Sequence, residues 1–243
     1  MDESIRVAEI HASRGASWIG ESWRLFAAAP LAWMGLCAAW VMLTVALFFI
    51  PIIGGVIAFF LQPVFLAGFA ITAYRQSAGE RVVMADLFAG FRRNVRALVN
   101  LGAILLMAQI VIVAVMALLG LPMKPSPPDQ QLSIADYAES MNGKEWILVV
   151  GVALTAVVKG ALWFAPQLIA FHGMGTVQSI RWSVYAAISN IGALLVYGVA
   201  MLGLFIAAVL PIPFVFGLAI VVPLSVISTY VGYRDVFEGL KSQ

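Results

Sequence analysis

The chain has 243 residues, of which 63% are hydrophobic and 11% are charged, and its formal net charge is +2. Soluble domains are about 45–50% apolar and about 25% charged, so this composition excludes an ordinary soluble globular domain. The single cysteine, Cys37, excludes an intrachain disulfide and a cysteine-based metal or redox centre, and the small positive charge gives no argument for a nucleic-acid partner.

The first 29 residues contain charged side chains throughout and no early apolar core, so no signal peptide is predicted. Six apolar blocks follow, at roughly 31–50, 52–74, 98–121, 146–171, 191–210 and 212–233. A bilayer core about 30 Å thick needs about 20 apolar residues in a helix, and a helix satisfies its own backbone hydrogen bonds. The sequence therefore predicts an all-α membrane protein with six transmembrane helices in one membrane domain, residues 1–243. The first block is expected to act as an uncleaved insertion signal.

The distribution of Lys and Arg predicts how these helices are oriented. Eleven of these residues lie on one side of the blocks: Arg6, Arg14, Arg24, Arg75, Arg81, Arg92, Arg93, Arg96, Arg181, Arg234 and Lys241. The opposite side has only Lys124 and Lys144. Because Lys and Arg accumulate in cytoplasmic loops, we expect both termini in the cytoplasm and the 122–145 loop outside.

A short pattern (aliphatic, aromatic, Ala, small) precedes three of the blocks, at "LFAA", "LFAG" and "VYAA". Phe26 and Tyr74 are 48 residues apart, as are Tyr185 and Tyr233, and both closing tyrosines are followed by arginine. The sequence therefore predicts three repeat units, approximately 17–75, 83–172 (with the external loop 122–145) and 176–235. Each unit is an interfacial amphipathic helix followed by an in-out-in hairpin, and a pseudo-threefold axis along the membrane normal relates the parallel units. The alternative is coincidence among alanine-rich helices.

The middle surface segment has the clearest amphipathic pattern. Met84, Leu87, Phe88, Phe91 and Val95 follow a helical spacing and predict an α-helix that lies in the membrane interface. Arg92, Arg93 and Arg96 follow it closely, and such a basic cluster attracts anionic lipid headgroups. The alternative is that these arginines only reflect the positive-inside bias.

Lys159 is the most unusual residue, because it falls near the middle of the fourth block. A lysine at the bilayer centre costs about 2.5–3.5 kcal/mol, and no block contains a carboxylate to pair with it. With Gln62, Gln167 and Thr155 it forms a candidate intramembrane polar site for an anionic ligand. The alternative is a lysine satisfied by backbone carbonyls or water, or one that snorkels along its helix.

Pro63, Pro166 and Pro223 lie inside the second, fourth and sixth blocks, where each removes one backbone hydrogen bond and predicts a kink. We therefore expect these three helices to form an inner ring. The freed carbonyls either line a polar cavity or take part in helix-to-helix packing.

Several motifs resemble those of an uncharacterised family of polytopic inner-membrane proteins from proteobacteria. They are "RGASWIGESWRLF", "APLAWMGL", "DLFAGFRRN", "FAPQLIAFHGM" and "YRDVF". The resemblance covers nearly the whole chain and implies a bacterial inner-membrane location with six spans. It implies no activity and supplies no catalytic residues, and the external loop and the Lys159 region match none of its motifs.

No catalytic constellation, metal-ligand set or phosphate loop is recognisable, so we expect no catalytic residues, no metal and no cofactor. Two classes of function remain. The first is a non-enzymatic scaffold or accessory protein that binds membrane lipids and, in addition, a membrane-protein partner or a second copy of itself. The second is a small transporter or channel with a polar midplane site around Lys159.

Overall fold

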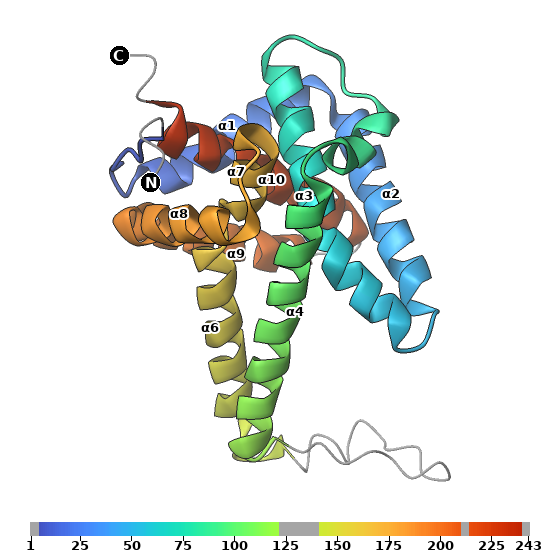
Figure 1. Ribbon diagram of the computed structural model, residues 1–243, viewed down its shortest axis with the longest axis vertical. Helices are drawn as coiled ribbons and strands as arrows, with labels where there is room; N and C mark the ends of the chain where they lie inside the picture. Colours follow the sequence, from blue (N-terminus) through green and yellow to red (C-terminus); the bar gives the residue numbers. More distant parts are fainter. Residues whose placement is uncertain (1–4, 122–140, 210–213, 240–243) are drawn as a thin grey trace. The chain divides into compact units, whose positions relative to one another are not determined.

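The structure of the protein, a computed structural model, describes residues 5–121, 141–209 and 214–239. Its elements in chain order are α1 (Arg14–Ala28), α2 (Pro30–Phe48), α3 (Ile53–Ser77), η1 (Met84–Arg92), α4 (Val95–Leu118), α6 (Glu145–Ala161), α7 (Ala165–His172), α8 (Thr176–Ser189), α9 (Ile191–Val209) and α10 (Phe214–Phe237). Every element in these ranges is a helix and none is a strand, which confirms the predicted all-helical fold (Figure 1).

Six helical segments among the described residues are long and apolar enough to cross a membrane. They are Pro30–Phe48, Ile53–Ser77, Val95–Leu118, Glu145–His172, Ile191–Val209 and Gly217–Phe237. These segments coincide with the six apolar blocks, because block length and hydropathy follow directly from the thickness of a bilayer.

The degree of burial separates these segments into two groups. In Ile53–Ser77 and Gly217–Phe237, 56% and 61% of the most apolar window is buried, against 17% in each of the other four segments. The second and sixth helices are therefore central, as expected. The fourth is central only in part, because α7 is buried from Ala165 to Ala170 whereas most of α6 is exposed.

The chain divides into two compact units. The first comprises Met1–Ala103 with Ala161–Gln243, and the second comprises Ile104–Gly160, the central part of the predicted repeat unit 83–172. In the second unit α6 runs beside the end of α4 (Figure 1). Gly151 of α6 lies against Met116 of α4, and a Cβ at Gly151 would be 2.4 Å from the methionine sulfur.

Helix α1 packs against α9 and α10 in the first unit. Its buried residues, Gly15, Trp18, Ser22 and Phe26, recur every three or four positions and so form one face of the helix. Gly15 is needed for this contact, because a Cβ there would lie 2.0 Å from the Ala193 carbonyl oxygen of α9. The predicted amphipathic helix is thus present, and its buried face contacts protein.

Helix α8 also packs one face on the protein and leaves apolar side chains on its other face. Its buried face contains Ser179, Trp182, Ser183 and Ala186, whereas the apolar side chains of Val177 and Ile188 are exposed. These exposed apolar side chains are available to another apolar phase. This arrangement is typical of a helix that lies in a membrane interface.

The middle surface segment is η1, a 3₁₀-helix and not the predicted α-helix. With three residues per turn, Leu87 and Gly90 fall on the buried side, while Phe88 and Phe91 fall on the exposed side. Val95, the last member of the expected stripe, is the first residue of α4. The predicted five-residue apolar face is therefore wrong.

The tighter helix follows from close packing of η1 on α3. A Cβ at Gly90 would lie 2.0 Å from the Val64 carbonyl oxygen, and a Cβ at Gly68 would lie 2.7 Å from the Leu87 carbonyl oxygen. The two backbones can approach this closely only because both positions are glycine. Asp86 of η1 is 4% exposed and accepts a hydrogen bond from the Val83 N–H at 3.0 Å.

Candidate functional site

Arg92, Arg93 and Arg96, called the arginine cluster below, lie where η1 ends and α4 begins. Arg92 is the last residue of η1, Arg93 is extended (φ −105°, ψ −168°), and Arg96 is in the first turn of α4. All three side chains are exposed. The change of direction at Arg93 places the arginines of two different helices at one corner of the first unit.

This corner is held in place by Asn94. Its Nδ2 donates to the Met174 carbonyl oxygen at 3.2 Å, and its Oδ1 accepts from the Ala97 N–H at 3.4 Å. Thr176 Oγ1 donates to the Ala97 carbonyl oxygen at 3.0 Å, which adds a second link to the segment after α7. The backbone that carries the arginines is therefore fixed, although their side chains are exposed.

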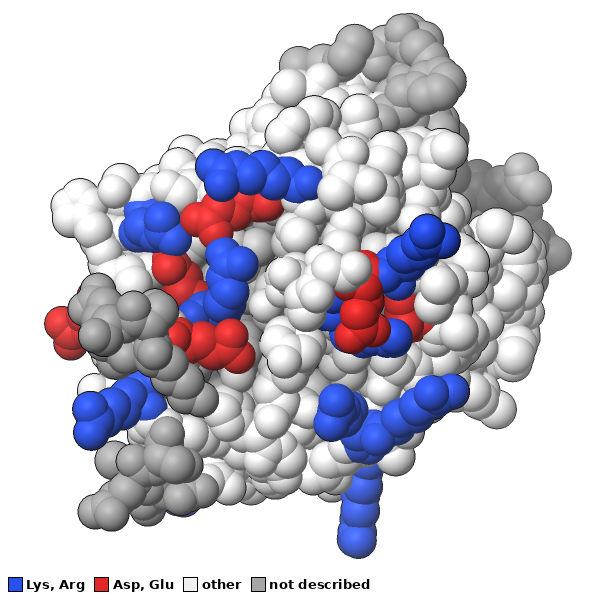
Figure 2. Space-filling model, turned by 90° about the horizontal axis from the view of Figure 1, so that it is seen from above, with Lys and Arg blue, Asp and Glu red and all other residues white. Residues whose placement is uncertain are grey.

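The acidic residues beside η1 are already paired. Arg75 contacts Glu80 and Asp86, each at 2.6 Å, and Asp86 also caps the start of η1. In the described part of the chain, no carboxylate lies within ion-pair distance of the arginine cluster. Figure 2 shows a face on which acidic side chains lie against basic ones, while other basic side chains stand apart from any acidic residue.

Two aromatic side chains accompany the arginine cluster. Phe88 and Phe91 are 51% and 38% exposed, and their rings are 6.0 Å apart between centroids. Both also contact Phe65 of α3, at 6.3 and 5.7 Å, so their positions are fixed by packing. Exposed aromatic rings beside unpaired arginines match the chemistry of a membrane interface, where rings meet the acyl boundary and arginines meet headgroups.

The predicted polar site is divided between the two units: Gln62 and Gln167 belong to the first, and Thr155 and Lys159 belong to the second. Gln167 is 1% exposed. With the amide turned so that its nitrogen faces backbone acceptors, Nε2 donates to the carbonyl oxygens of Trp163 and Phe164 at 3.1 and 3.2 Å, and Oε1 lies 3.0 Å from Thr229 Oγ1, which also donates to the Val226 carbonyl oxygen. Gln167 thus joins α7 to α10 and uses its amide entirely on protein groups.

Gln62 is half-buried beside a small pocket between α2 and α3. The pocket has a volume of about 170 Å³ and is lined by Trp40, Thr44, Phe48, Ala58, Phe59 and Gln62. In the second unit, Thr155 is half-buried and Lys159 is exposed, four residues further along α6. These two side chains share one face of their helix.

The three prolines occupy two kinds of position. Pro63 and Pro223 lie inside α3 and α10, as predicted. Pro166 is different, because the fourth span is interrupted between Ala161 and Ala165 and Pro166 stands at the start of α7. The predicted kink at Pro166 is therefore a complete break, and proline is favoured at such a helix start because its missing N–H has no partner to lose there.

Ser183 of α8 stabilises this break. Its Oγ donates to the Ala161 carbonyl oxygen at 2.8 Å and accepts from the Phe164 N–H at 3.1 Å. One hydroxyl thus satisfies backbone groups on both sides of the interruption. The Leu162 carbonyl, expected to be freed by Pro166, accepts from the Ala165 N–H at 3.2 Å.

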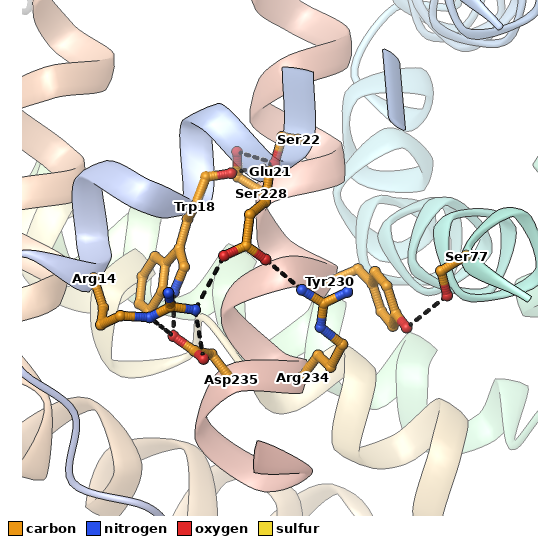
Figure 3. Close-up of polar contacts among 9 residues, drawn as sticks. All are labelled: Arg14, Trp18, Glu21, Ser22, Ser77, Ser228, Tyr230, Arg234 and Asp235. Carbon is orange, nitrogen blue, oxygen red and sulfur yellow. Dashed lines mark hydrogen bonds and ion pairs between the residues drawn. The ribbon is translucent and has the colours of Figure 1, made fainter. Parts of the chain in front are cut away.

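A charged network that the sequence analysis missed joins α1 to α10 (Figure 3). Arg14 Nε and Nη2 donate to Asp235 at 2.9 and 2.8 Å, and Trp18 Nε1 donates to the same carboxylate at 3.0 Å. Glu21 pairs with Arg14 at 3.0 Å and also with Arg234. Arg14, Trp18 and Glu21 are spaced four and three residues apart, and this spacing was the signal that could have shown a shared helix face.

Hydrogen bonding to Asp235 and the charges of Asp235 and Glu21 raise the pKa of Arg14 above its ordinary value, against the opposing effect of burial. Further polar contacts continue along α10. Ser228 Oγ lies 3.0 Å from Ser22 Oγ, and the Tyr230 hydroxyl lies 3.1 Å from Ser77 Oγ. The network therefore connects α10 to α1 and to the end of α3 (Figure 3).

The aromatic residues that close the three predicted repeat units meet in the first unit. The ring centroids of Tyr74 and Phe171 are 5.6 Å apart, and those of Phe171 and Tyr233 are 5.1 Å apart. His172, which follows Phe171, has its Nε2 2.7 Å from the Tyr233 hydroxyl. The ends of α3, α7 and α10 thus converge on one aromatic cluster.

Comparison with known proteins gives one informative match. The chain is 27% identical over 208 residues to a probable inner membrane protein of Burkholderia thailandensis, and the match covers 80% of this chain and 74% of that protein. No family profile matches the sequence, and no solved structure is similar to the chain. The chain is thus all-helical, has six candidate spans in the described residues and is similar to a bacterial inner-membrane protein.

Proposed function

We propose that this chain is an integral protein of a bacterial inner membrane that acts without catalysis, as a scaffold or accessory protein. In this proposal it binds anionic lipid through the arginine cluster and presents its helices to another membrane protein or to a second copy of itself. Both termini are cytoplasmic, and the three repeat units form in-out-in hairpins around a pseudo-threefold axis. Nucleic acid and cofactors have no part in this function.

The arginine cluster is the observation that carries the proposal. Three exposed arginines stand on a corner fixed by Asn94, and the neighbouring carboxylates, Glu80 and Asp86, are taken by Arg75. Arg93 and Arg96 also flank the start of α4, where the helix dipole is positive and favours an anion. An anionic headgroup would neutralise charges that the described part of the chain leaves unpaired.

Two further observations support parts of the proposal. The convergence of Tyr74, Phe171 and Tyr233 is what a pseudo-threefold arrangement of repeat units would produce. The use of Gln167 as a link between α7 and α10 favours a structural role for the polar residues of the first unit over a transport path. The transporter alternative therefore depends on Lys159, and recognition of a partner helix is a different role for that residue.

The lipid proposal can be tested by measuring which lipids stay bound. The protein, extracted in mild detergent from a bacterial membrane, would be analysed by native mass spectrometry for retained phosphatidylglycerol and cardiolipin. In the variant with Arg92, Arg93 and Arg96 all replaced by Gln, we expect anionic lipid retention to fall by about fivefold per arginine, because each charge contributes about 1 kcal/mol.

The matched control replaces Arg24, Arg81 and Arg181, which are also exposed and have no ion pair in the described ranges. This control keeps the total charge change the same, and we expect it to retain anionic lipid as the unmodified protein does. An equal loss in both triple variants would mean that the arginines act only as a general positive-inside bias. Unchanged retention in the cluster variant would overturn the lipid proposal.

A further inference from the structure

We infer that α6 carries a docking surface for a partner transmembrane helix with an acidic residue at the middle of its span, and that Lys159 recognises this residue. The inference rests on the proposed scaffold or accessory function and specifies the chemistry of the partner. Its basis is the position of Lys159, the composition of the helix face around it and the absence of a suitable carboxylate in the described spans.

Lys159 lies far from both ends of its span. The segment Glu145–His172 has 28 residues, and Lys159 is 14 residues after its first residue and 13 before its last. The first distance is continuous α6 and corresponds to about 20 Å of helix at 1.5 Å per residue, whereas the second includes the interruption between Ala161 and Ala165. The four-carbon stem of a lysine covers only a small part of the first distance, so snorkelling alone does not bring the ammonium group to the headgroups at the Glu145 end.

The face of α6 that carries Lys159 is apolar apart from Thr155. Leu148, Val152, Thr155 and Lys159 are spaced four, three and four residues apart, which places them in one stripe. Val152 is 70% exposed, and Leu148 and Lys159 are also exposed. Lipid tails can cover the apolar members of such a face, but an ammonium group at this depth requires a polar or charged partner.

The described spans offer no carboxylate at the depth of Lys159. The acidic residues of these segments stand at their ends: Glu145 is the first residue of α6, and Asp235 is near the end of α10. Asp235 is already bound by Arg14 and Trp18. In the described part of the chain Lys159 therefore has no ion pair, and the inferred carboxylate belongs to another molecule.

A second copy of the chain does not meet this requirement. Two copies in the same membrane have the same orientation, so a twofold axis through this face would set Lys159 against the partner copy's lysine. Like charges at close distance in a low-dielectric medium repel strongly. The charge thus favours a different membrane protein whose helix has Asp or Glu at its centre.

The recognition step can be tested with a defined probe. The purified protein, labelled with a fluorophore and placed in phosphatidylcholine vesicles, would be titrated with a labelled Leu/Ala transmembrane peptide that has one central Glu. We expect energy transfer to report about tenfold tighter association than with the same peptide carrying Gln, since an intramembrane polar contact contributes about 1–2 kcal/mol. Lys159→Met should remove this preference, and Lys159→Arg should keep it.

A second arm tests the surface in living cells with a photoreactive residue. The photoreactive residue would be placed at position 152, which lies on the Lys159 face. The matched control is position 157, which is 68% exposed and lies about 160° around the helix from Lys159. We expect a cross-link to a membrane protein from position 152 only, lost in Lys159→Met. An exchange of charges should restore the cross-link: this protein would carry Lys159→Glu, and the partner would carry Lys in place of its central acidic residue.

Several outcomes would overturn the inference: no preference for the Glu peptide, a cross-link that survives Lys159→Met, a cross-link to a second copy, or a partner without a central acid. Lipid retention measured on Lys159→Met separates the two proposals. Normal retention with loss of peptide binding supports both, whereas unchanged retention in the arginine cluster variant with normal peptide binding would refute the lipid proposal alone.

Discussion

Asp235 is the residue on which the contact between α1 and α10 depends most. Its carboxylate accepts two hydrogen bonds from Arg14 and one from Trp18. Because Trp18 is fully buried, its indole N–H has no access to water if the acceptor is removed. The raised pKa of Arg14 means that this arginine keeps its charge at every pH below its ordinary pKa.

Replacing Asp235 with Ala should therefore lower the free energy of unfolding by about 1–2 kcal/mol, or Tm by about 2–8 °C. The Tm of the purified protein in detergent, followed by intrinsic tryptophan fluorescence, measures this effect. Glu80→Gln is the comparison, since Glu80 forms an exposed ion pair with Arg75 and should cost less. Equal losses in the two variants would show that burial beside Trp18 does not matter.

Gly90 gives a second prediction at this scale. An alanine Cβ would lie 2.0 Å from the Val64 carbonyl oxygen, so Gly90→Ala must push η1 away from α3 and lower Tm. Gly20→Ala is the control, because Gly20 is inside α1 and no atom lies within 4 Å of its Cβ position. There the substitution should raise stability by about 1 kcal/mol through helix propensity. A raised Tm in both variants would contradict the close contact.

Sequence analysis could not predict most of these contacts between individual residues. Gly90 was visible as the small residue of a repeated pattern, but a pattern does not say which backbone lies against it. Asp235 and Glu21 were visible as charges near predicted spans, and only the fold brings residues 14 and 235 together. Gln167 was correctly identified as polar within a span, while its partner Thr229 depended on the contact between α7 and α10.

At the scale of elements, the interruption between α6 and α7 is the feature most open to test. Ser183→Ala would leave the Phe164 N–H and the Ala161 carbonyl oxygen without the hydroxyl that contacts both. Since Phe164 is fully buried, we expect a loss of about 1–3 kcal/mol, read as a lower Tm or earlier unfolding in denaturant.

Ser225→Ala is the matched control for this prediction. Ser225 also bears a hydroxyl in a helix, but that hydroxyl donates only to the Val222 carbonyl oxygen of its own helix. Its removal should change stability little. If Ser183→Ala behaves like Ser225→Ala, the break between α6 and α7 is stabilised by packing and not by the shared hydroxyl.

Sequence analysis predicted the spans well and the surface elements less well, for a physical reason. A span must match the bilayer in length and hydropathy, and both properties are local. The form of η1 depends on Gly68 of α3 and on the pairing of Asp86 with Arg75, which are tertiary contacts. The break before Pro166 likewise depends on Ser183, which lies in a later helix.

For the whole molecule, the proposed orientation leads to a labelling experiment. In a background with Cys37 replaced by Ala, a cysteine at position 144 should react with a membrane-impermeant maleimide in spheroplasts. A cysteine at position 81 should react only after the membrane is permeabilised, because Arg81 lies on the side with the excess of Lys and Arg. The reverse pattern would place both termini outside and refute the proposed orientation.

The contacts between the first and last parts of the chain have a consequence for biosynthesis. The Ala8 N–H donates to the Val236 carbonyl oxygen, and Arg14 binds Asp235 across a separation of 221 residues. At about 5–20 residues per second, a ribosome needs about 10–45 s to make the intervening chain. During that time the face of α1 that carries Trp18 has not met its final neighbours. A chain that stops before α10 would keep that face uncovered, and such an incomplete product would be recognisable to the proteases and chaperones that survey newly made proteins.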